Sequence, residues 1–401
     1  MFPQAGLKRL SRMTMTDVQV RARWLAVTSV AIGTFTIVTS EMLPVGLLTS
    51  IAGDLGISAG TAGLAMSAPG LVAAVAAPVL AVGARRVDRR LILMGLMALL
   101  AVANLAGAIA PDATVLLAAR VLTGVSIGGF WAFAAGLGPR LVPERSVGRA
   151  TSIILGGVSV ASVLGVPAAT FVSSFAGWRS AFVATGVLAL ALLAVLAATL
   201  PPLKPSLEPE SSPTPEKRSS WFSGPLRVIL VLTALTVAGH FAAYTYVRPF
   251  LEQVAHAGPA LVSTALLLYG AAGVAGNFVA GAQAARNPRA TLIVRVLLMA
   301  VPMIALVTTG LPALIPLVVW GFGYGGVGVT LQLWIMRSGG GELSTALFVC
   351  SFNLSIALGS FAGGRIADAL PVSAVMWAGA ALTLLSAAVA GIAGRSRTSG
   401  S

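Results

Sequence analysis

Residues 201–225 read PPLKPSLEPESSPTPEKRSSWFSGP, and this stretch interrupts a chain that is otherwise strongly apolar. Its Pro, Ser and Glu content is typical of a flexible linker, because such a composition cannot bury enough apolar surface to fold. Long apolar runs separated by short polar loops lie on either side of it. We therefore predict an N-terminal unit over residues 1–200, a linker over 201–225 and a C-terminal unit over 226–401.

The apolar runs predict membrane helices. The 401 residues are 57% hydrophobic and only 9% charged, whereas a soluble domain carries about 25% charged residues. A membrane-spanning helix needs about 20 mainly apolar residues. The sequence indicates an all-α membrane protein with twelve transmembrane helices in two six-helix bundles. The predicted spans are 24–50, 58–82, 91–110, 113–138, 151–175, 179–200, 226–250, 259–284, 290–309, 312–336, 343–368 and 371–393.

The basic residues predict the orientation. Of the 26 Lys and Arg residues, 22 lie before the first span, in alternate loops or in the tail, and the other side holds only Arg179, Arg248 and Arg365. Loops rich in these residues stay in the cytoplasm, so both termini are predicted to be cytoplasmic. The excess of Arg over Lys suggests a bacterial source, and hence a multi-pass protein of the bacterial inner membrane. The net charge of +14 then comes from the basic residues of the cytoplasmic loops and termini. No nucleic-acid partner is therefore expected.

Several classes of protein are disfavoured by what the sequence lacks. One cysteine, Cys350, and two histidines provide neither a disulfide framework nor a metal site. A nucleotide-driven pump needs a Gly-Lys-Ser/Thr phosphate loop, and none of the three lysines follows a glycine. We expect no enzyme activity, no metal and no cofactor.

Short motifs carry a family resemblance. They are Thr39–Leu48, Ile51–Ser58, Arg120–Gly124, Gly128–Ala132, Gly177–Arg179, Gly239–Phe241 and Tyr244–Pro249. With these segments the chain resembles the major facilitator superfamily, and within it the bacterial drug:proton antiporter branch, which exports drugs, sugars and nucleosides. The stretch 128–179 is similar to bacterial purine ribonucleoside efflux pumps. Two motifs depart from the family pattern: the loop 83–90 lacks its second glycine, and Gly165-Val166-Pro167 stands where Gly-Pro is usual.

The resemblance implies a major facilitator fold, in which two bundles rock about a solute site between them. It also implies a transporter that is not an enzyme and is mostly monomeric. By the resemblance, Asp88 and Arg89 in the loop after the second span are expected to be gating contacts.

Glu41 is the strongest site candidate, because it lies inside the first predicted span. A buried carboxylate is costly in a membrane and is a functional hypothesis by default. Loss of hydration favours the protonated form of a carboxyl group, so Glu41 is predicted to bind and release protons. The alternative is a protonated side chain that only hydrogen-bonds a neighbouring helix.

Arg120 and His240 complete the predicted proton-coupling set. Arg120 is the one basic residue that we assign to the interior of a span, and the resemblance associates it with proton coupling; the alternative is a structural tie to backbone carbonyls. His240 shares a helix face with Thr236 and Tyr244 at four-residue spacing. It is predicted to join the proton path or bind solute, and the alternative is a histidine satisfied by hydrogen bonds.

Other polar and aromatic side chains are predicted to line a substrate cavity. They are Thr34, Trp131, Thr236, Tyr244, Asn277, Gln332, Trp334 and Asn353. Each has the alternative of holding helices together, as small and polar residues do in membranes. Because none of them is charged, we expect a neutral or weakly cationic solute.

The leading hypothesis is a secondary active exporter that exchanges external protons for a small organic solute by alternating access. Its expected partners are that solute, protons and the lipid bilayer. Proton-coupled uptake is an alternative that the sequence separates from export only through the family resemblance. A facilitator channel also stays open. A membrane sensor is the alternative from another class. A purine nucleoside, a sugar and an antibiotic such as chloramphenicol all remain open as the substrate.

Overall fold

The structure is a computed structural model that describes residues 5–84, 86–134, 137–203, 224–309, 312–338 and 342–392. All regular secondary structure in these ranges is helical. Twelve helical stretches among them are long and apolar enough to cross a membrane. The predicted all-α architecture with twelve spans is thus confirmed. Most of the predicted linker, residues 204–223, lies outside the described residues.

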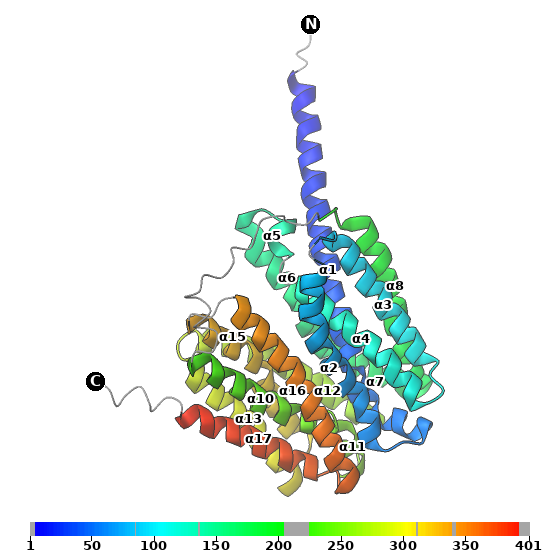
Figure 1. Ribbon diagram of the computed structural model, residues 1–401, viewed down its shortest axis with the longest axis vertical. Coiled ribbons are helices and arrows are strands. Elements are labelled where there is room, and N and C mark those ends of the chain that lie inside the picture. The colour runs from blue at the N-terminus through cyan, green and yellow to red at the C-terminus, as the bar shows by residue number, and fades with distance from the viewer. Residues whose placement is uncertain are drawn as a thin grey trace, which may run out of the picture.

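The N half comprises the described residues up to 203 (Figure 1). Its spans are α1 (Ala5–Leu55), α2 (Ala59–Gly83), α3 (Arg89–Ala108), α4 (Ala113–Ala134), a fifth built from α6 (Val147–Val160), η2 (Ala161–Gly165) and α7 (Val166–Ala176), and α8 (Trp178–Thr199). Two short helices, α5 (Gly138–Leu141) and η1 (Glu144–Ser146), precede α6. Helix α1 begins far before the predicted residue 24 and projects beyond the bundle, because residues 7–23 contain neither Gly nor Pro to end it.

The C half comprises the described residues from 224 onward (Figure 1). Its spans are α10 (Gly224–Tyr244) with α11 (Val247–Gln253), α12 (Pro259–Ala284), α13 (Pro288–Thr308), α14 (Leu314–Gly325) with α15 (Val327–Arg337), α16 (Glu342–Ala369) and α17 (Ala374–Ile392). The break between α10 and α11 precedes Pro249, which has no backbone N–H to donate to the carbonyl of Thr245.

An internal repeat is visible in how corresponding loops begin their helices. Asp88 accepts a hydrogen bond from the Arg90 N–H at the start of α3, and Asn287 accepts one from the Ala290 N–H at the start of α13. The guanidinium of Arg90 then donates to the Ala197 carbonyl near the end of α8 (2.6 Å). Arg289 likewise donates to the Ala390 carbonyl near the end of α17 (2.7 Å). Each half thus ties its third span to its sixth by an arginine at the loop.

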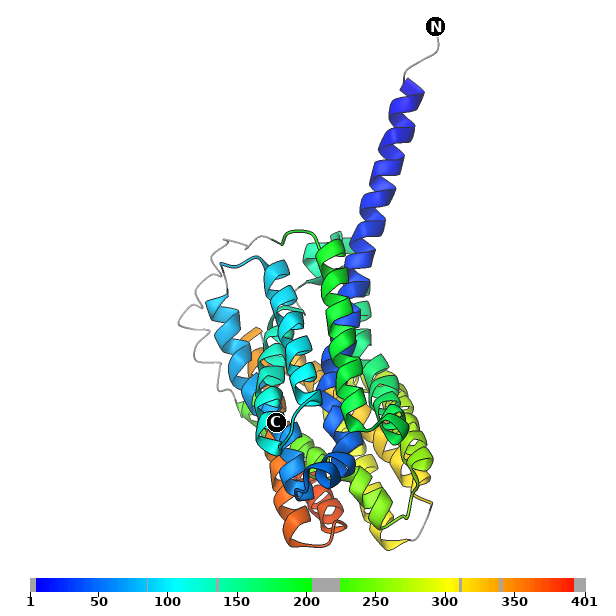
Figure 2. The same cartoon turned by 90° about the vertical axis from the view of Figure 1, so that its right-hand side faces the viewer.

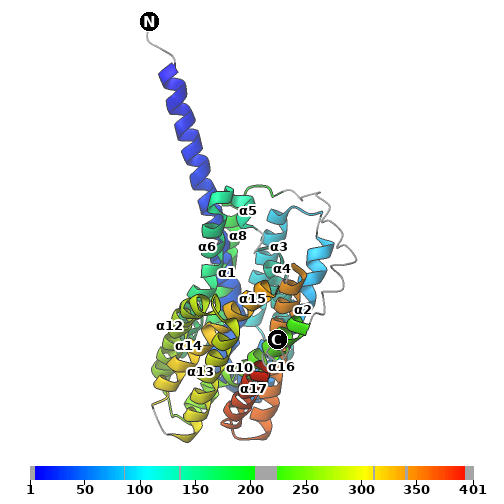
Figure 3. The same cartoon turned by 90° about the vertical axis from the view of Figure 1, so that its left-hand side faces the viewer.

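The arginine-rich end of the molecule is the one that carries these loops and the start of α1, and the other is called the opposite end. At the opposite end the two halves are packed together (Figures 2 and 3). Helix α2 runs along α16, α12 packs on η2 and α7, and α11 touches α1. One apolar core cluster is shared by both halves, joining Leu43, Leu47 and Met66 to Phe241 and Phe250.

This contact surface, called the seam, extends from the opposite end to about mid-height. Gly60 at the start of α2 faces Gly364, and Gly70 further along faces the backbone of Asn353. Beyond that point the arginine-rich part of α2 leaves Val79 and Val82 61% exposed. The axes of the halves diverge toward their arginine-rich ends (Figure 1). The conformation is therefore one in which the halves are joined at the opposite end.

Candidate functional site

Glu41 lies near the middle of the membrane-spanning part of α1, which extends over Arg23–Leu55. The residue is 6% exposed, and no hydrogen bond or ion pair to its carboxylate occurs among the described side chains. The next residue, Met42, packs against the apolar core cluster shared by both halves. A buried carboxyl group without a hydrogen bond or ion pair among the described residues thus lies where the two halves meet.

Arg120, on α4, is fully buried and is held by backbone carbonyls. Its Nε donates to the Ala65 carbonyl (2.8 Å), and its two terminal nitrogens donate to the carbonyls of Ser40 (2.9 Å) and Glu41 (3.0 Å). There is no ion pair with the Glu41 carboxylate. The guanidinium therefore fastens α4 to α1 and α2 and fixes the backbone that carries Glu41.

Two prolines explain why these carbonyls need an outside donor. In an α-helix the carbonyl of residue i accepts from the N–H of residue i+4, which proline lacks. Pro44 leaves the Ser40 carbonyl without that donor, and Pro69 does the same for Ala65. Arg120 supplies both missing hydrogen bonds with one planar group.

A buried polar pair lies beside this arrangement. Asn104 on α3 donates to the Ser40 hydroxyl (2.9 Å), and the Ser40 hydroxyl donates to the Asn104 side-chain oxygen (3.1 Å). Asn104 also donates to the Leu100 carbonyl of its own helix (2.8 Å). The residue preceding Glu41 is therefore fixed on both its carbonyl and its hydroxyl.

His240 forms the centre of an aromatic cluster in the C half. Its ring stacks on Tyr324 with the centroids 3.4 Å apart, and on Tyr244 at 4.9 Å. Tyr269 continues the stack beside Tyr244 at 4.7 Å, and Trp320 stands edge-on to it. The rings come from α10, α12 and α14, so three helices build one wall.

The hydrogen bonds of His240 define its protonation state. The indole Nε1 of Trp320 donates to Nδ1 of His240 (3.2 Å). An indole nitrogen is a donor only, so Nδ1 carries no proton and the ring is neutral, with its proton on Nε2 toward the Tyr269 hydroxyl (3.5 Å). This geometry matches the alternative of a histidine satisfied by hydrogen bonds.

The predicted cavity residues fall into two groups. Thr34 and Thr236 are fully buried inside their own halves: Thr34 donates to the Val30 carbonyl and packs on Gly157, and Thr236 bonds the Ser386 hydroxyl (2.7 Å). Both therefore have the contacts of helix packing. Tyr244 is also buried. The remaining five residues are only partly buried: Trp131, Asn277, Gln332, Trp334 and Asn353.

Two of the partly buried residues have side-chain bonds within the C half. Gln332 donates to the Thr345 hydroxyl (3.2 Å), linking α15 to α16. Asn353 donates to the Val349 carbonyl of its own helix (2.9 Å). Asn353 also borders the seam, since its carbonyl faces Gly70 of the N half.

Two contacts tie the predicted gating residues to spans of the N half in the described part of the chain. Asp88 accepts from the backbone N–H of Leu203 (3.0 Å), just after α8. The Arg89 guanidinium lies over the Phe133 ring of α4, 5.5 Å from its centroid. Both residues thus fix the loop between α2 and α3 against neighbouring spans, and a gating role for them stays a prediction.

Arg120 is not the only basic residue inside a span, contrary to the sequence-based assignment. Arg295 lies two turns into α13 and is 1% exposed. It donates to the Gln283 side chain (2.8 Å) and to the Phe322 carbonyl (3.3 Å), and stacks on the Phe322 ring. In the sequence it follows closely on Arg286 and Arg289 and is therefore one of the 22 basic residues assigned to the loops and termini of the cytoplasmic side.

Sequence reasoning missed the partners that complete the site. Ser40, Asn104, Tyr269, Trp320 and Tyr324 were not predicted. Tyrosine and tryptophan within apolar spans look like ordinary packing residues, and only the fold brings them to His240. Asn104 gave a usable signal, since an amide inside a span requires a hydrogen-bond partner.

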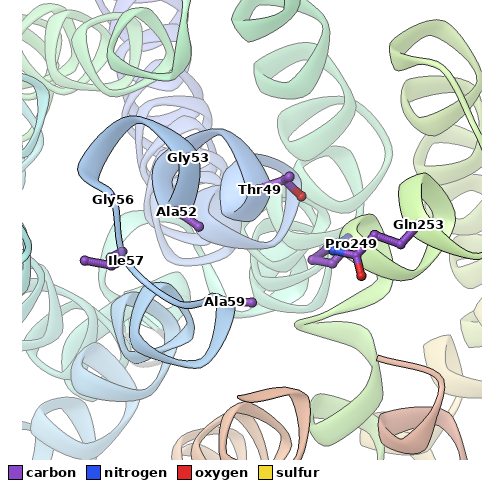
Figure 4. A pocket seen from close by; sticks show the side chains of 8 residues that line it. All are labelled: Thr49, Ala52, Gly53, Gly56, Ile57, Ala59, Pro249 and Gln253. Atoms are coloured by element: carbon purple, nitrogen blue, oxygen red, sulfur yellow. The ribbon is translucent and has the colours of Figure 1, made fainter. Parts of the chain in front are cut away.

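A recess of about 310 Å³ lies at the opposite end, lined by both halves (Figure 4). Its walls are the last turns of α1, the connection to α2, and α11, with Thr49 and Gln253 as its polar side chains. It carries no charged residue, and no group of three or more His, Cys, Asp or Glu occurs in the described part of the chain.

Comparison with solved structures supports the fold. A bacterial homologue of the human lysosomal transporter Spinster aligns with a TM-score of 0.74 at 17% identity, covering 93% of this chain and 97% of that one. The nucleoside transporter NupG, solved as a point mutant, aligns with a TM-score of 0.75 at 9% identity, covering 92% of this chain and 99% of that one. At such identities the likeness concerns the fold alone.

Sequence relatives and a family model define the family. The transcription regulatory protein OpdE of Pseudomonas aeruginosa is 35% identical, covering 93% of this chain and 94% of that protein. The inner membrane transport protein YdhP of Escherichia coli K12 is 33% identical (89% and 94%), and the purine ribonucleoside efflux pump NepI of the same strain 30% (92% and 94%). The Major Facilitator Superfamily model matches residues 30–349. The chain is therefore a multi-pass membrane protein that belongs to the major facilitator superfamily.

Proposed function

We propose that the protein is a secondary exporter that exchanges external protons for a small, planar, neutral or weakly cationic organic solute. The observation that carries the proposal is Glu41, a buried carboxyl group without a hydrogen bond or ion pair among the described residues, located where the halves meet. Such a group binds a proton or a solute donor, and both cannot occupy it at once. Competition of this kind couples the two fluxes.

The C half supports the solute class. Tyr324 is the outer ring of the aromatic stack. Aromatic faces bind planar rings and cations, and the His240 ring is neutral. A planar solute between Tyr324 and Glu41 would find a stacking surface on one side and an acceptor on the other.

Proton release by Glu41 then depends on the positions of the halves. In the present conformation the halves diverge at the arginine-rich end, which the positive-inside rule assigns to the cytoplasm. In this conformation Glu41 would release its proton inward and accept solute. Rocking of the halves would then expose the loaded site to the opposite side, where protons displace the solute.

The membrane potential provides enough energy for such an exchange. One net charge moving through 100 mV yields about 2.3 kcal/mol. At about 1.4 kcal/mol per factor of ten, this sustains a concentration ratio of roughly 50. A proton-driven exporter of a neutral solute would therefore concentrate it usefully without nucleotide hydrolysis.

The test uses inverted membrane vesicles with an imposed pH gradient, acidic inside. A purine ribonucleoside, a sugar and chloramphenicol are offered as labelled probes, since the relative NepI is named a purine ribonucleoside efflux pump. We expect at least one probe to accumulate and the accumulation to collapse when the gradient is dissipated. Accumulation only with the gradient reversed would instead favour proton-coupled uptake.

A sensor without transport is the second candidate, because the relative OpdE is named a transcription regulatory protein. In that case no probe would move, although a ligand would still bind. Binding measured by tryptophan fluorescence in the same vesicles separates the two functions, since Trp320 lies within the aromatic cluster.

A further inference from the structure

We propose that Arg248, Tyr246 and Asp368 of the C half form a latch across the seam, which holds the opposite end closed and must release before that end opens. Each of the three contacts the N half directly. They come from α11, from the residue before it and from the end of α16. The latch sets the fraction of molecules in which the central site is open to each side of the membrane.

Arg248 forms the buried part of the latch. It is 7% exposed, and its guanidinium donates to the Gly46 carbonyl of α1. Its Nε donates to the Glu252 carboxylate one turn later (2.7 Å), which fixes the side chain in place and balances its charge. Separation of α11 from α1 would remove the Gly46 carbonyl and leave this guanidinium with Glu252 as its acceptor.

Asp368 forms the exposed part. One carboxylate oxygen accepts from the Gly60 N–H (2.8 Å) and the other from the Ser58 hydroxyl (2.9 Å). Both groups lie at the start of α2, whose free N–H groups and helix dipole attract a negative charge. A carboxylate of the C half thus caps a helix of the N half.

Tyr246 fills the space between these two contacts. The residue is fully buried, and its hydroxyl donates to the Ser360 carbonyl (2.8 Å). The same hydroxyl lies directly against Gly63 of α2, where any larger side chain would collide with it. The fit requires glycine on α2 and positions the phenol ring between α2 and α16.

The latch has no counterpart at the arginine-rich end in this conformation, as far as the described residues show. There, Asp88, Arg90, Arg289 and Arg337 bond groups of their own halves. Among the described residues, the other polar contact across the seam is a weak one at mid-height, from the Cys350 thiol to the Ala74 carbonyl (3.8 Å). The recess in Figure 4 borders the latch through Pro249, next to Arg248.

The test measures the distance between spin labels on the two halves at the opposite end. Cys350→Ser removes the only native cysteine, and Ser174→Cys and Ala255→Cys place labels on exposed residues near the end of α7 and just after α11. The protein is measured in lipid nanodiscs by pulsed electron spin resonance. The variants are Arg248→Gln, Asp368→Ala and the milder Asp368→Asn, which retains one acceptor oxygen.

Matched controls lie at the same end but within the N half. Arg179 bonds Asp54 and the Ala110 carbonyl, and Asp112 caps α4 through the Val115 N–H (3.0 Å). Arg179→Gln and Asp112→Ala therefore remove an arginine and a capping carboxylate without touching the seam. They separate loss of a cross-seam contact from general loss of stability.

We expect the long-distance population to rise roughly fivefold in Asp368→Ala and roughly tenfold or more in Arg248→Gln. Asp368→Asn should give a smaller rise, and the two controls no change. Unchanged distances in both Arg248→Gln and Asp368→Ala would overturn the proposal, as would equal shifts in the controls. The measurement needs neither solute nor proton gradient, so its outcome is independent of the proposed function.

Discussion

Arg120 donates to three backbone carbonyls and so fixes the segment that carries Glu41, while its predicted part in proton coupling stays a prediction. A planar guanidinium reaches three carbonyls that an ammonium group cannot serve together. Arg120→Lys should therefore lower the free energy of unfolding by roughly 2–4 kcal/mol, measured by thermal or denaturant unfolding in detergent. Arg145→Lys, at an exposed position, is the control and should be neutral. Equal stability of the two variants would contradict the role given to the three hydrogen bonds.

His240 is held neutral by Trp320, so it should not be the residue that titrates during transport. In His240→Asn the amide oxygen can replace Nδ1 as acceptor. We expect this variant to lower solute affinity several-fold while the pH at half-maximal transport stays where it is in the native protein. A flattened or displaced pH profile in His240→Asn would return this residue to the proton path, as predicted from its sequence context.

The site residues that the sequence reveals are those whose chemistry is out of place. Glu41, Arg120 and His240 are conspicuous because ionisable groups are rare in apolar spans. Tyr324 and Trp320 are not conspicuous, since aromatic side chains are common there. Their role depends on three helices meeting at His240, and spacing within one helix carries no information about that.

Helices α1 and α2 each continue through a proline whose missing hydrogen bond Arg120 replaces. Pro44→Ala would return an N–H donor to the Ser40 carbonyl. In this background Arg120→Lys should cost about 1 kcal/mol less than in the native chain. The measurement is a double-mutant cycle of unfolding free energies.

The control for this cycle is Pro302→Ala in α13, another proline inside a helix. The carbonyl it affects belongs to Leu298, which Arg120 does not contact. Its effect should add to that of Arg120→Lys within the usual few tenths of a kcal/mol. Additivity in the Pro44 cycle as well would show that the proline and the arginine act independently.

Helix α2 can approach α16 because it presents glycine at the seam. Gly63→Ala would place a methyl group against the Tyr246 hydroxyl and should favour the conformation in which the opposite end is open. Gly53→Ala is the matched control, because no atom lies within 4 Å of an added methyl group there. Accessibility of a cysteine at Ala357, buried beside Gly70, to a membrane-impermeant thiol reagent reports the change. This probe also requires the Cys350→Ser background.

Among the helices, the sequence predicts the membrane spans because about 20 apolar residues suffice to define one. The sequence does not predict where the α-helix is interrupted within a span. The π-helical turn at Ala161–Gly165 and the break after Gly325 arise within continuous apolar runs. The start of α1 at Ala5 was missed for the opposite reason, because a polar sequence without helix-breaking residues extends the helix beyond the apolar segment.

For the whole molecule, the sequence predicts two sets of six spans and a cytoplasmic arginine-rich end. It does not predict which end is closed. That property depends on cross-half contacts such as Arg248 with Gly46 and Asp368 with Gly60, between residues 202 and 308 positions apart. In the sequence Arg248 belongs to the motif Tyr244–Pro249 and is one of the few basic residues on the far side, and only the fold shows that it joins the halves.

The central claim is that Glu41 carries the proton that drives solute export, and one measurement tests it most directly. Inverted vesicles containing native protein or Glu41→Gln are given an acidic interior and a labelled probe that the native protein accumulates. We expect Glu41→Gln to reduce accumulation at least about tenfold, while exchange of the probe down its own gradient persists. Accumulation by Glu41→Gln equal to that of the native protein, with the same dependence on pH, would contradict it.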